Sequence, residues 1–146
     1  MSNFLKYSAY YDLLYKDKDY QGEADYVAAT LRAAAPQARR ILEFGSGTGK
    51  HGRLFAAMGF DVRGIERSAE MVSLADQVPV EGPGRFTSEV GDMTEVSLGE
   101  TFDAVIALFH VVSYVTANED LLKVFQIAAD HLAPGGVFMF DVWHGP

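Results

Sequence analysis

Residues 39–50, RRILEFGSGTGK, decide the fold of this chain. The stretch begins as a short apolar strand, carries the acidic residue Glu43 near its end, and then has glycine at every second position before a helical segment. Glycine is needed where a Cβ would collide with a bound molecule or forbid the required φ and ψ. The helix that follows directs its free N–H groups at the same spot. The stretch therefore predicts the binding loop of a nucleotide-type cofactor.

The composition is typical of one globular domain. The chain has 146 residues, of which 49% are hydrophobic and 12% aromatic, enough for a core and too apolar for disorder. It has no cysteine, which excludes disulfides and thiolate metal sites and fits a reducing cytoplasm. The sequence predicts no signal peptide, and it has no apolar run near the ~20 residues that span a bilayer. The net charge of −8 argues against nucleic acid as a partner.

Helix-like and strand-like stretches alternate on both sides of the loop. We expect helices over residues 4–15, from 19 or 21 to 35, over 49–58, over 68–76, and from 118 or 119 to 132. We expect strands over residues 40–44, 61–65, 85–90, 102–108 and 137–142. This order predicts an α/β fold with a Rossmann-like, doubly wound, mostly parallel sheet. Ligands of such sheets bind past the carboxyl ends of the strands, so candidate site residues are sought there.

Two cofactors compete for the loop after the first strand. Residues 47–52 match the dinucleotide pattern G-x-G-x-x-G, but the pyrophosphate of a dinucleotide would be repelled by Glu43 at the mouth of the loop. S-adenosylmethionine has no phosphate and carries an ammonium and a sulfonium, so Glu43 favours it. The alternative is that Glu43 points to solvent beside a tight turn. The predicted cofactor contacts in this stretch are Glu43, Gly45, Ser46, Gly47 and Gly49.

Acidic residues also follow the second and third strands. Glu66 is placed to accept hydrogen bonds from ribose hydroxyls, unless it pairs with a nearby arginine at the surface. Asp92 is placed to accept from the adenine amine, with Met93 lining the ring, unless Asp92 is only a turn residue. Arg67 and Met71, next along the chain from Glu66, are included in the predicted cofactor site.

Polar side chains follow the fourth strand. Leu108 and Phe109 are predicted to line the cofactor, and His110 is predicted to act as a general base or to orient the acceptor. The alternative is a histidine bound to a backbone carbonyl. Tyr114 is the second candidate for removing a proton from the acceptor.

Tyrosines gather at the amino end of the chain. At helical spacing they are either core residues or part of a lid, and we include Tyr11 and Tyr15 in the predicted cofactor site as lid residues. His51, His131 and His144 show no ligand spacing, so no metal is expected.

These motifs together resemble the class I S-adenosylmethionine-dependent methyltransferases. The resemblance rests on Glu66 and on residues 43–49, 91–93, 102–105 and 132–136. Residues 11–15, YDLLY, followed by residues 18–20, KDY, are similar to the amino-terminal segment of sugar-amine N,N-dimethyltransferases. The resemblance implies one cofactor-binding domain over residues 1–146, a helical lid over residues 1–36, and metal-free methyl transfer to a small-molecule amine or hydroxyl, with S-adenosylhomocysteine as the product.

The chain departs from that family in two places. His110 directly follows Phe109, and Tyr114 stands near the position where the family tends to have its histidine, so a sugar amine is only one candidate acceptor. The family's sheet usually has seven strands, whereas five are expected here, so the carboxyl-terminal part of the fold is expected to be missing. The exposed edge of the fifth strand then predicts self-association. Two alternatives remain: an NAD-type dinucleotide-binding domain and a non-catalytic fragment that binds S-adenosylmethionine.

Overall fold

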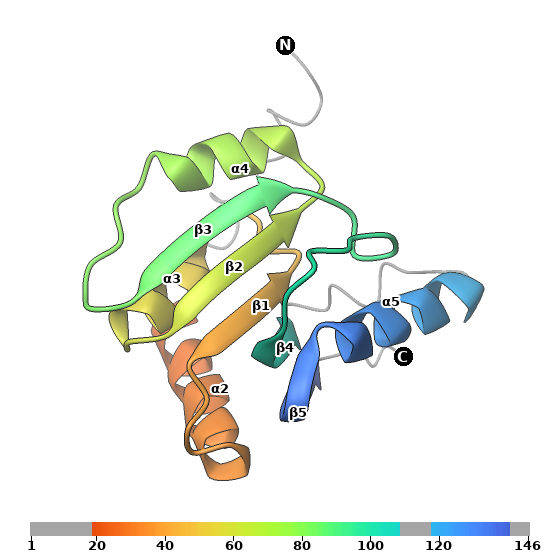
Figure 1. Cartoon of the computed structure of the whole chain (residues 1–146). Coiled ribbons are helices and arrows are strands. Elements are labelled where there is room, and N and C mark those ends of the chain that lie inside the picture. Colours follow the sequence, from red (N-terminus) through yellow and green to blue (C-terminus); the bar gives the residue numbers. More distant parts are fainter. Residues whose placement is uncertain (1–18, 109–117, 141–146) are drawn as a thin grey trace, which may run out of the picture.

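The computed structural model describes residues 19–108 and 118–140. Its elements are α2 (Tyr20–Ala34), β1 (Arg40–Phe44), α3 (Lys50–Ala57), β2 (Asp61–Glu66), α4 (Ala69–Asp76), β3 (Arg85–Val90), β4 (Phe102–Ala107), α5 (Asn118–Asp130) and β5 (Leu132–Phe140) (Figure 1). The five strands lie in the order β3-β2-β1-β4-β5, and every neighbouring pair is parallel. The predicted α/β, doubly wound sheet is therefore confirmed. The helix predicted over residues 4–15 lies outside the described residues.

Helices cover both faces of the sheet. Alternation along β1 sends Ile41 into a core with α2 and α3, and sends Leu42 and Phe44 into a second core with α5. All three side chains are fully buried. Because both faces are covered, β4 is a near-continuous apolar run, which is typical of a parallel sheet.

The amino ends of β1 and β4 are fastened together by one side chain. Asp103 Oδ2 accepts the backbone N–H groups of Arg39 and Arg40, each at 2.9 Å. These donors precede the ladder in which Ile41 lies opposite Ala104. The bonds fix the register of the two strands, and so they place the ends of both strands at the opposite edge of the sheet.

The last strand begins earlier than predicted. The sequence predicts a strand from residue 137, but β5 starts at Leu132, which lies opposite Phe102 before the register shifts at Ala104. The predicted start is wrong because a Pro-Gly-Gly turn signal lies within an irregular part of the ladder, not before it. Gly135, with a φ of 82°, provides the irregular backbone.

Candidate functional site

The loop of residues 45–49, here called the glycine loop, has a backbone that requires its glycines. Gly45, Gly47 and Gly49 have φ values of 67°, 58° and 84°, which L side chains rarely adopt. The Gly45 N–H donates to the Ile65 carbonyl at 2.8 Å and fixes the loop to the end of β2. A Cβ built on Gly47 meets no described atom within 4 Å. Bare backbone at Gly47 therefore faces open space where a ligand can lie against it.

Glu66, at the end of β2, is bound to the glycine loop. Its Oε1 accepts the Gly47 N–H at 3.0 Å, and its Oε2 accepts the Ser68 N–H at 2.8 Å. Ser68 in turn caps α4, because its Oγ accepts the Met71 N–H. The carboxylate thus joins the loop to the start of α4, and it retains lone pairs for further donors.

Asp92 follows β3 and is held in a tight turn. Its Oδ1 accepts the N–H and the Oγ1–H of Thr94, at 2.8 and 2.7 Å. These hydrogen bonds, with a smaller contribution from the charge of Arg67, hold the pKa of Asp92 below its usual value. The Gly91 N–H donates to the Glu66 carbonyl at 2.9 Å, which brings the ends of β2 and β3 together. Two carboxylates therefore follow neighbouring strands beside the glycine loop.

Glu43 lies beneath α3 and does not point to solvent. It is 2% exposed, and its Oε1 lies 3.0 Å from the place of a Cβ on Gly52. Among the described residues, neither this oxygen nor the Oγ of Ser46 has a hydrogen-bond partner. Burial raises the pKa of Glu43 to about 8, the charge of Glu66 adds to the rise, and Arg53 opposes it. The carboxyl group is therefore mostly protonated at pH 7.

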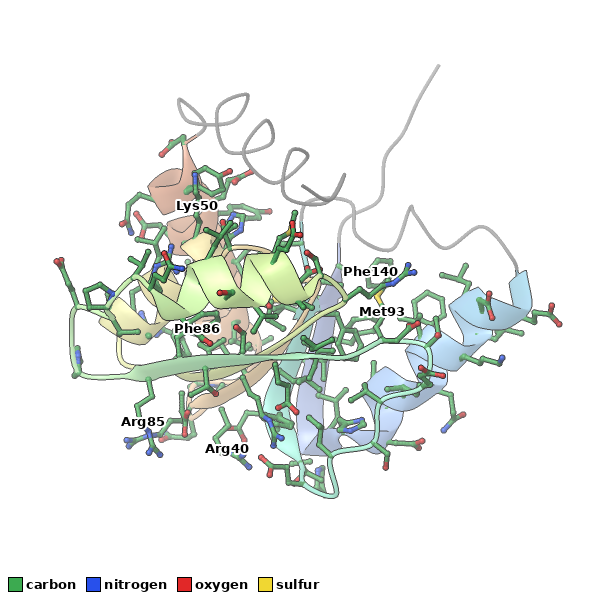
Figure 2. All side chains as sticks on the ribbon, turned by 90° about the horizontal axis from the view of Figure 1, so that it is seen from above. Arg40, Lys50, Arg85, Phe86, Met93 and Phe140 are labelled. Carbon is green, nitrogen blue, oxygen red and sulfur yellow. The ribbon has the colours of Figure 1, made fainter. Side chains whose placement is uncertain are left out.

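The third glycine of the G-x-G-x-x-G pattern serves packing. A Cβ on Gly52 would stand 2.3 Å from the ring of Phe86, and one on Gly49 would stand 2.7 Å from the same ring. Phe86 comes from β3, beyond β2 as seen from β1 (Figures 1 and 2). The two glycines therefore let the ring of Phe86 lie against the start of α3.

A pocket, here called the α2 pocket, lies beside α2 at the carboxyl ends of β4 and β5. It has a volume of about 490 Å³ and is lined by α2, by the first turn of α3 and by the ends of β4 and β5. Its described polar side chains are Asp19, Glu23, His51 and the phenol of Tyr26, and Leu108 and Phe140 are among its apolar ones. Of the predicted cofactor residues that the structure describes, Leu108 alone lines this pocket. In Figure 2, Phe140 at the carboxyl end of β5 and Met93 after β3 lie on one side of the view. Arg40 and Arg85, at the amino ends of β1 and β3, lie on the opposite side.

Sequence reasoning missed Glu23 and His51 as site residues. Glu23 Oε1 lies 3.0 Å from His51 Nε2, although the two residues are 28 positions apart. The packing of α2 on α3 brings them together, and no motif spacing records that contact. The one signal in the sequence is that each lies in the first turn of a predicted helix.

The remaining predicted site residues fall into two groups. Met71 is buried in α4, Met93 is partly buried after β3, and Arg67 is exposed between Glu66 and α4. The other five lie outside the described residues, and nothing in the structure tests them: Tyr11, Tyr15, Phe109, His110 and Tyr114.

No three histidine, aspartate or glutamate side chains in residues 19–108 and 118–140 come together in a way that would hold a metal ion. Within the same ranges, no helix is both long and apolar enough to cross a lipid bilayer. The predicted absence of a metal stays a prediction.

Comparison with known proteins identifies the family. A family model described as a methyltransferase domain matches residues 41–136, from β1 to the start of β5. The chain belongs to this methyltransferase family. The matched residues contain the glycine loop, Glu66 and Asp92 together. The family assignment thus favours the methyltransferase interpretation of the glycines over the dinucleotide-binding one.

Individual methyltransferases match nearly all of the chain. The dTDP-3-amino-3,4,6-trideoxy-alpha-D-glucopyranose N,N-dimethyltransferase of Streptomyces venezuelae is 35% identical over 138 residues, which are 93% of this chain and 56% of that protein. The crystal structure of DesVI from Streptomyces venezuelae matches with a TM-score of 0.82 and 36% identity, over 93% of this chain and 57% of that one.

A third relative was solved with its cofactor. The S-adenosylmethionine-bound structure of CalS10, an amino pentose methyltransferase of Micromonospora echinaspora, matches with a TM-score of 0.83 and 36% identity. The match covers 93% of this chain and 57% of CalS10. The chain thus spans little more than half the length of these methyltransferases, and the part it spans has the same fold.

Proposed function

We propose that this methyltransferase transfers a methyl group from S-adenosylmethionine to the amino group of a small molecule, an amino deoxysugar being the first candidate. The observation that carries the proposal is the exposed backbone of Gly47 with the Glu66 carboxylate bound to its N–H at 3.0 Å. The names of relatives support the acceptor class, since the Streptomyces venezuelae protein is a dimethyltransferase of an amino trideoxysugar.

The residues present fit an adenosyl cofactor. The open space over Gly47 accommodates a molecule against the backbone, which a Cβ would obstruct. Glu66 would accept from the ribose hydroxyls, and Asp92 from the adenine amine, each with lone pairs beyond those used in the structure. Met93, Met71 and Arg67 would surround the adenosine.

Glu43 would act from beneath the loop and not from its mouth. A positive charge near this buried carboxyl group lowers its pKa and favours the ionised form. Glu43 Oε1 is buried and has no hydrogen-bond partner in the described part of the chain, which makes the carboxyl group sensitive to such a charge. The ammonium and sulfonium of S-adenosylmethionine suit this environment better than the pyrophosphate of a dinucleotide.

The chain's task in the reaction is mainly orientation. S-adenosylmethionine supplies a methyl group bound to a sulfonium, from which the neutral thioether is a good leaving group. The protein must hold the acceptor nitrogen in line with that methyl group and exclude water. His110 and Tyr114 remain the proposed groups for removing a proton from the amine, and His110→Ala should slow transfer without weakening cofactor binding.

We further propose that the protein acts in the cytoplasm on small molecules and not on nucleic acid. The absence of cysteine supports a reducing compartment, and the net charge of −8 argues against nucleic acid as the substrate.

In the described part of the chain β5 is bonded on one side alone, to β4, and Phe140 is 44% exposed. Such an edge favours association of copies, which light scattering would detect.

A ligand panel followed by a transfer assay tests the proposal. S-adenosylhomocysteine and S-adenosylmethionine should raise the thermal unfolding midpoint, whereas NAD and NADP should not. Mass spectrometry should then detect one or two added methyl groups on a dTDP-linked amino deoxysugar. Stabilisation by NAD alone would overturn the assignment. Stabilisation by S-adenosylhomocysteine without transfer to any amine would leave a non-catalytic binding domain.

A further inference from the structure

The α2 pocket lies where an acceptor would meet the cofactor. The strand order β3-β2-β1-β4-β5 places Asp92, Glu66 and the glycine loop along one half of the carboxyl edge of the sheet. Leu108 and Phe140, at the ends of β4 and β5, line the pocket in the other half. A molecule in the pocket is therefore separated from the adenosine-binding carboxylates by the glycine loop. Its volume of about 490 Å³ is that of a small-molecule site.

The pocket is chemically suited to an amine. Its described lining contains the carboxyl groups of Asp19 and Glu23 and the imidazole of His51, but no lysine or arginine. Asp19 caps α2, because its Oδ1 accepts the Gly22 N–H at 2.9 Å. The Glu23 side chain is 44% exposed, so a ligand in the pocket can reach its carboxylate beside the contact with His51. The apolar remainder of the wall suits the carbon skeleton that bears the amine.

His51 holds the Glu23 carboxylate in place. Its side chain is 11% exposed, and its Nε2 lies 3.0 Å from Glu23 Oε1. The ring of Tyr20 contacts the imidazole edge-on, with 5.1 Å between ring centroids. Because the imidazole comes from α3 and packs against α2, it restricts the rotamers of Glu23 and reduces the entropy lost on binding.

We propose that the α2 pocket binds the amino group of the methyl acceptor, with Glu23 as the residue that contacts it and His51 as a positioning residue. The inference rests on the proposed function, which it deepens by naming the site of the acceptor. The Glu23 carboxylate accepts a hydrogen bond from an acceptor N–H and fixes the direction of the nitrogen. A hydroxyl in place of the amine makes a weaker bond to the carboxylate, because it lacks the positive charge.

Binding of two probes of similar shape tests the inference without the reaction. Cyclohexylamine and cyclohexanol are titrated into the 146-residue chain, and the ¹³C-methyl signals of Met139 and Leu108 are followed by NMR. Cyclohexylamine should shift both signals and bind at least about tenfold more tightly than cyclohexanol, which is the advantage of a charge-assisted hydrogen bond. Equal affinity for the two probes, or no shift at either methyl group, would overturn the inference.

Variants at Glu23 and His51 then test whether these two residues cause the preference for the amine over the alcohol. Glu23→Gln should reduce cyclohexylamine affinity about tenfold, to the level of cyclohexanol, and His51→Phe should lower it by a smaller factor. In the double variant the second change should add nothing, since His51 acts through Glu23. Glu119→Gln, in the first turn of α5, is the matched control and should leave affinity unchanged. Unaltered amine binding in Glu23→Gln would contradict the assignment.

Cofactor binding and acceptor kinetics distinguish a failure of this inference from a failure of the proposed function. Thermal stabilisation by S-adenosylhomocysteine should be the same in Glu23→Gln as in the unchanged chain, because Glu23 lies across the glycine loop from Glu66. In a transfer assay with an amino deoxysugar, Glu23→Gln should raise KM for the acceptor about tenfold with a smaller fall in kcat. If kcat alone falls, Glu23 does not bind the amine. Loss of S-adenosylhomocysteine binding in the unchanged chain would instead overturn the proposed function.

Discussion

Glu43 shows how one buried carboxyl group links stability to pH. In the folded chain its pKa is raised to about 8 by burial, whereas the usual glutamate value is 4.5. The folded state therefore keeps this proton across a pH range in which the unfolded state has lost it. Stability from this group is complete below pH 4.5 and is lost as the pH rises toward 8.

Replacing Glu43 with glutamine tests this linkage. The free energy of unfolding of the unchanged chain should fall between pH 5 and 8 by up to about 1.4 kcal/mol per pH unit from this group. Glu43→Gln removes the titration, so its stability should exceed that of the unchanged chain at pH 8 by more than at pH 5. Urea unfolding at the two pH values measures the difference. Parallel pH profiles for the two proteins would contradict a raised pKa.

Position 52 requires glycine because a neighbouring ring leaves no room for a Cβ, and not because of its backbone φ. A Cβ there would stand 2.3 Å from the Phe86 ring, within a tightly packed core. Gly52→Ala should therefore destabilise the chain by about 1–3 kcal/mol, despite the higher helix propensity of alanine. Thermal unfolding of Gly52→Ala, Phe86→Leu and the double variant measures the effect. The double variant should be less destabilised than the sum of the two, and simple additivity would show that the ring is not the obstacle.

At the scale of elements, the site depends on how β1 and β4 are fixed to one another. The Asp103 carboxylate fastens their amino ends, and the ladder then carries the register to the edge where the glycine loop and Leu108 lie. A slip of one residue would move every side chain of a strand to the other face. The correct register of β1 against β4 is thus needed to place both the glycine loop and Leu108.

Removing the Asp103 carboxylate should weaken this junction. Asp103→Ala leaves the N–H groups of Arg39 and Arg40 without their acceptor, which should cost about 1–3 kcal/mol of unfolding free energy. Asp103→Asn keeps one acceptor oxygen and should cost less. Urea unfolding ranks the variants, and hydrogen exchange at the two amides should quicken most in Asp103→Ala. Equal stability of the alanine variant and the unchanged chain would show that the bonds contribute nothing.

At the scale of the whole molecule, the parts that sequence predicts are those set by local pattern. Glycine spacing predicts the loop with positive φ at Gly45, Gly47 and Gly49, and the apolar runs predict the parallel sheet. Glu66 and Asp92 are predicted as strand-end residues because neighbouring strand ends share one edge of a parallel sheet.

Features that depend on packing between distant segments are not predicted. The contact of Glu23 with His51 arises only when α2 packs on α3, so neither residue is recognised from spacing. The burial of Glu43 beneath α3 depends likewise on the close approach that Gly52 permits. The early start of β5 comes from pairing with β4, which overrides the local turn signal at residues 134–136.

A crystal structure of the chain with S-adenosylhomocysteine tests the central claim most directly. The account predicts the ligand against Gly45 to Gly49, its ribose hydroxyls within hydrogen-bond distance of the Glu66 carboxylate, and its adenine amine near Asp92. A ligand bound elsewhere, or one whose ribose is turned away from Glu66, would contradict the account.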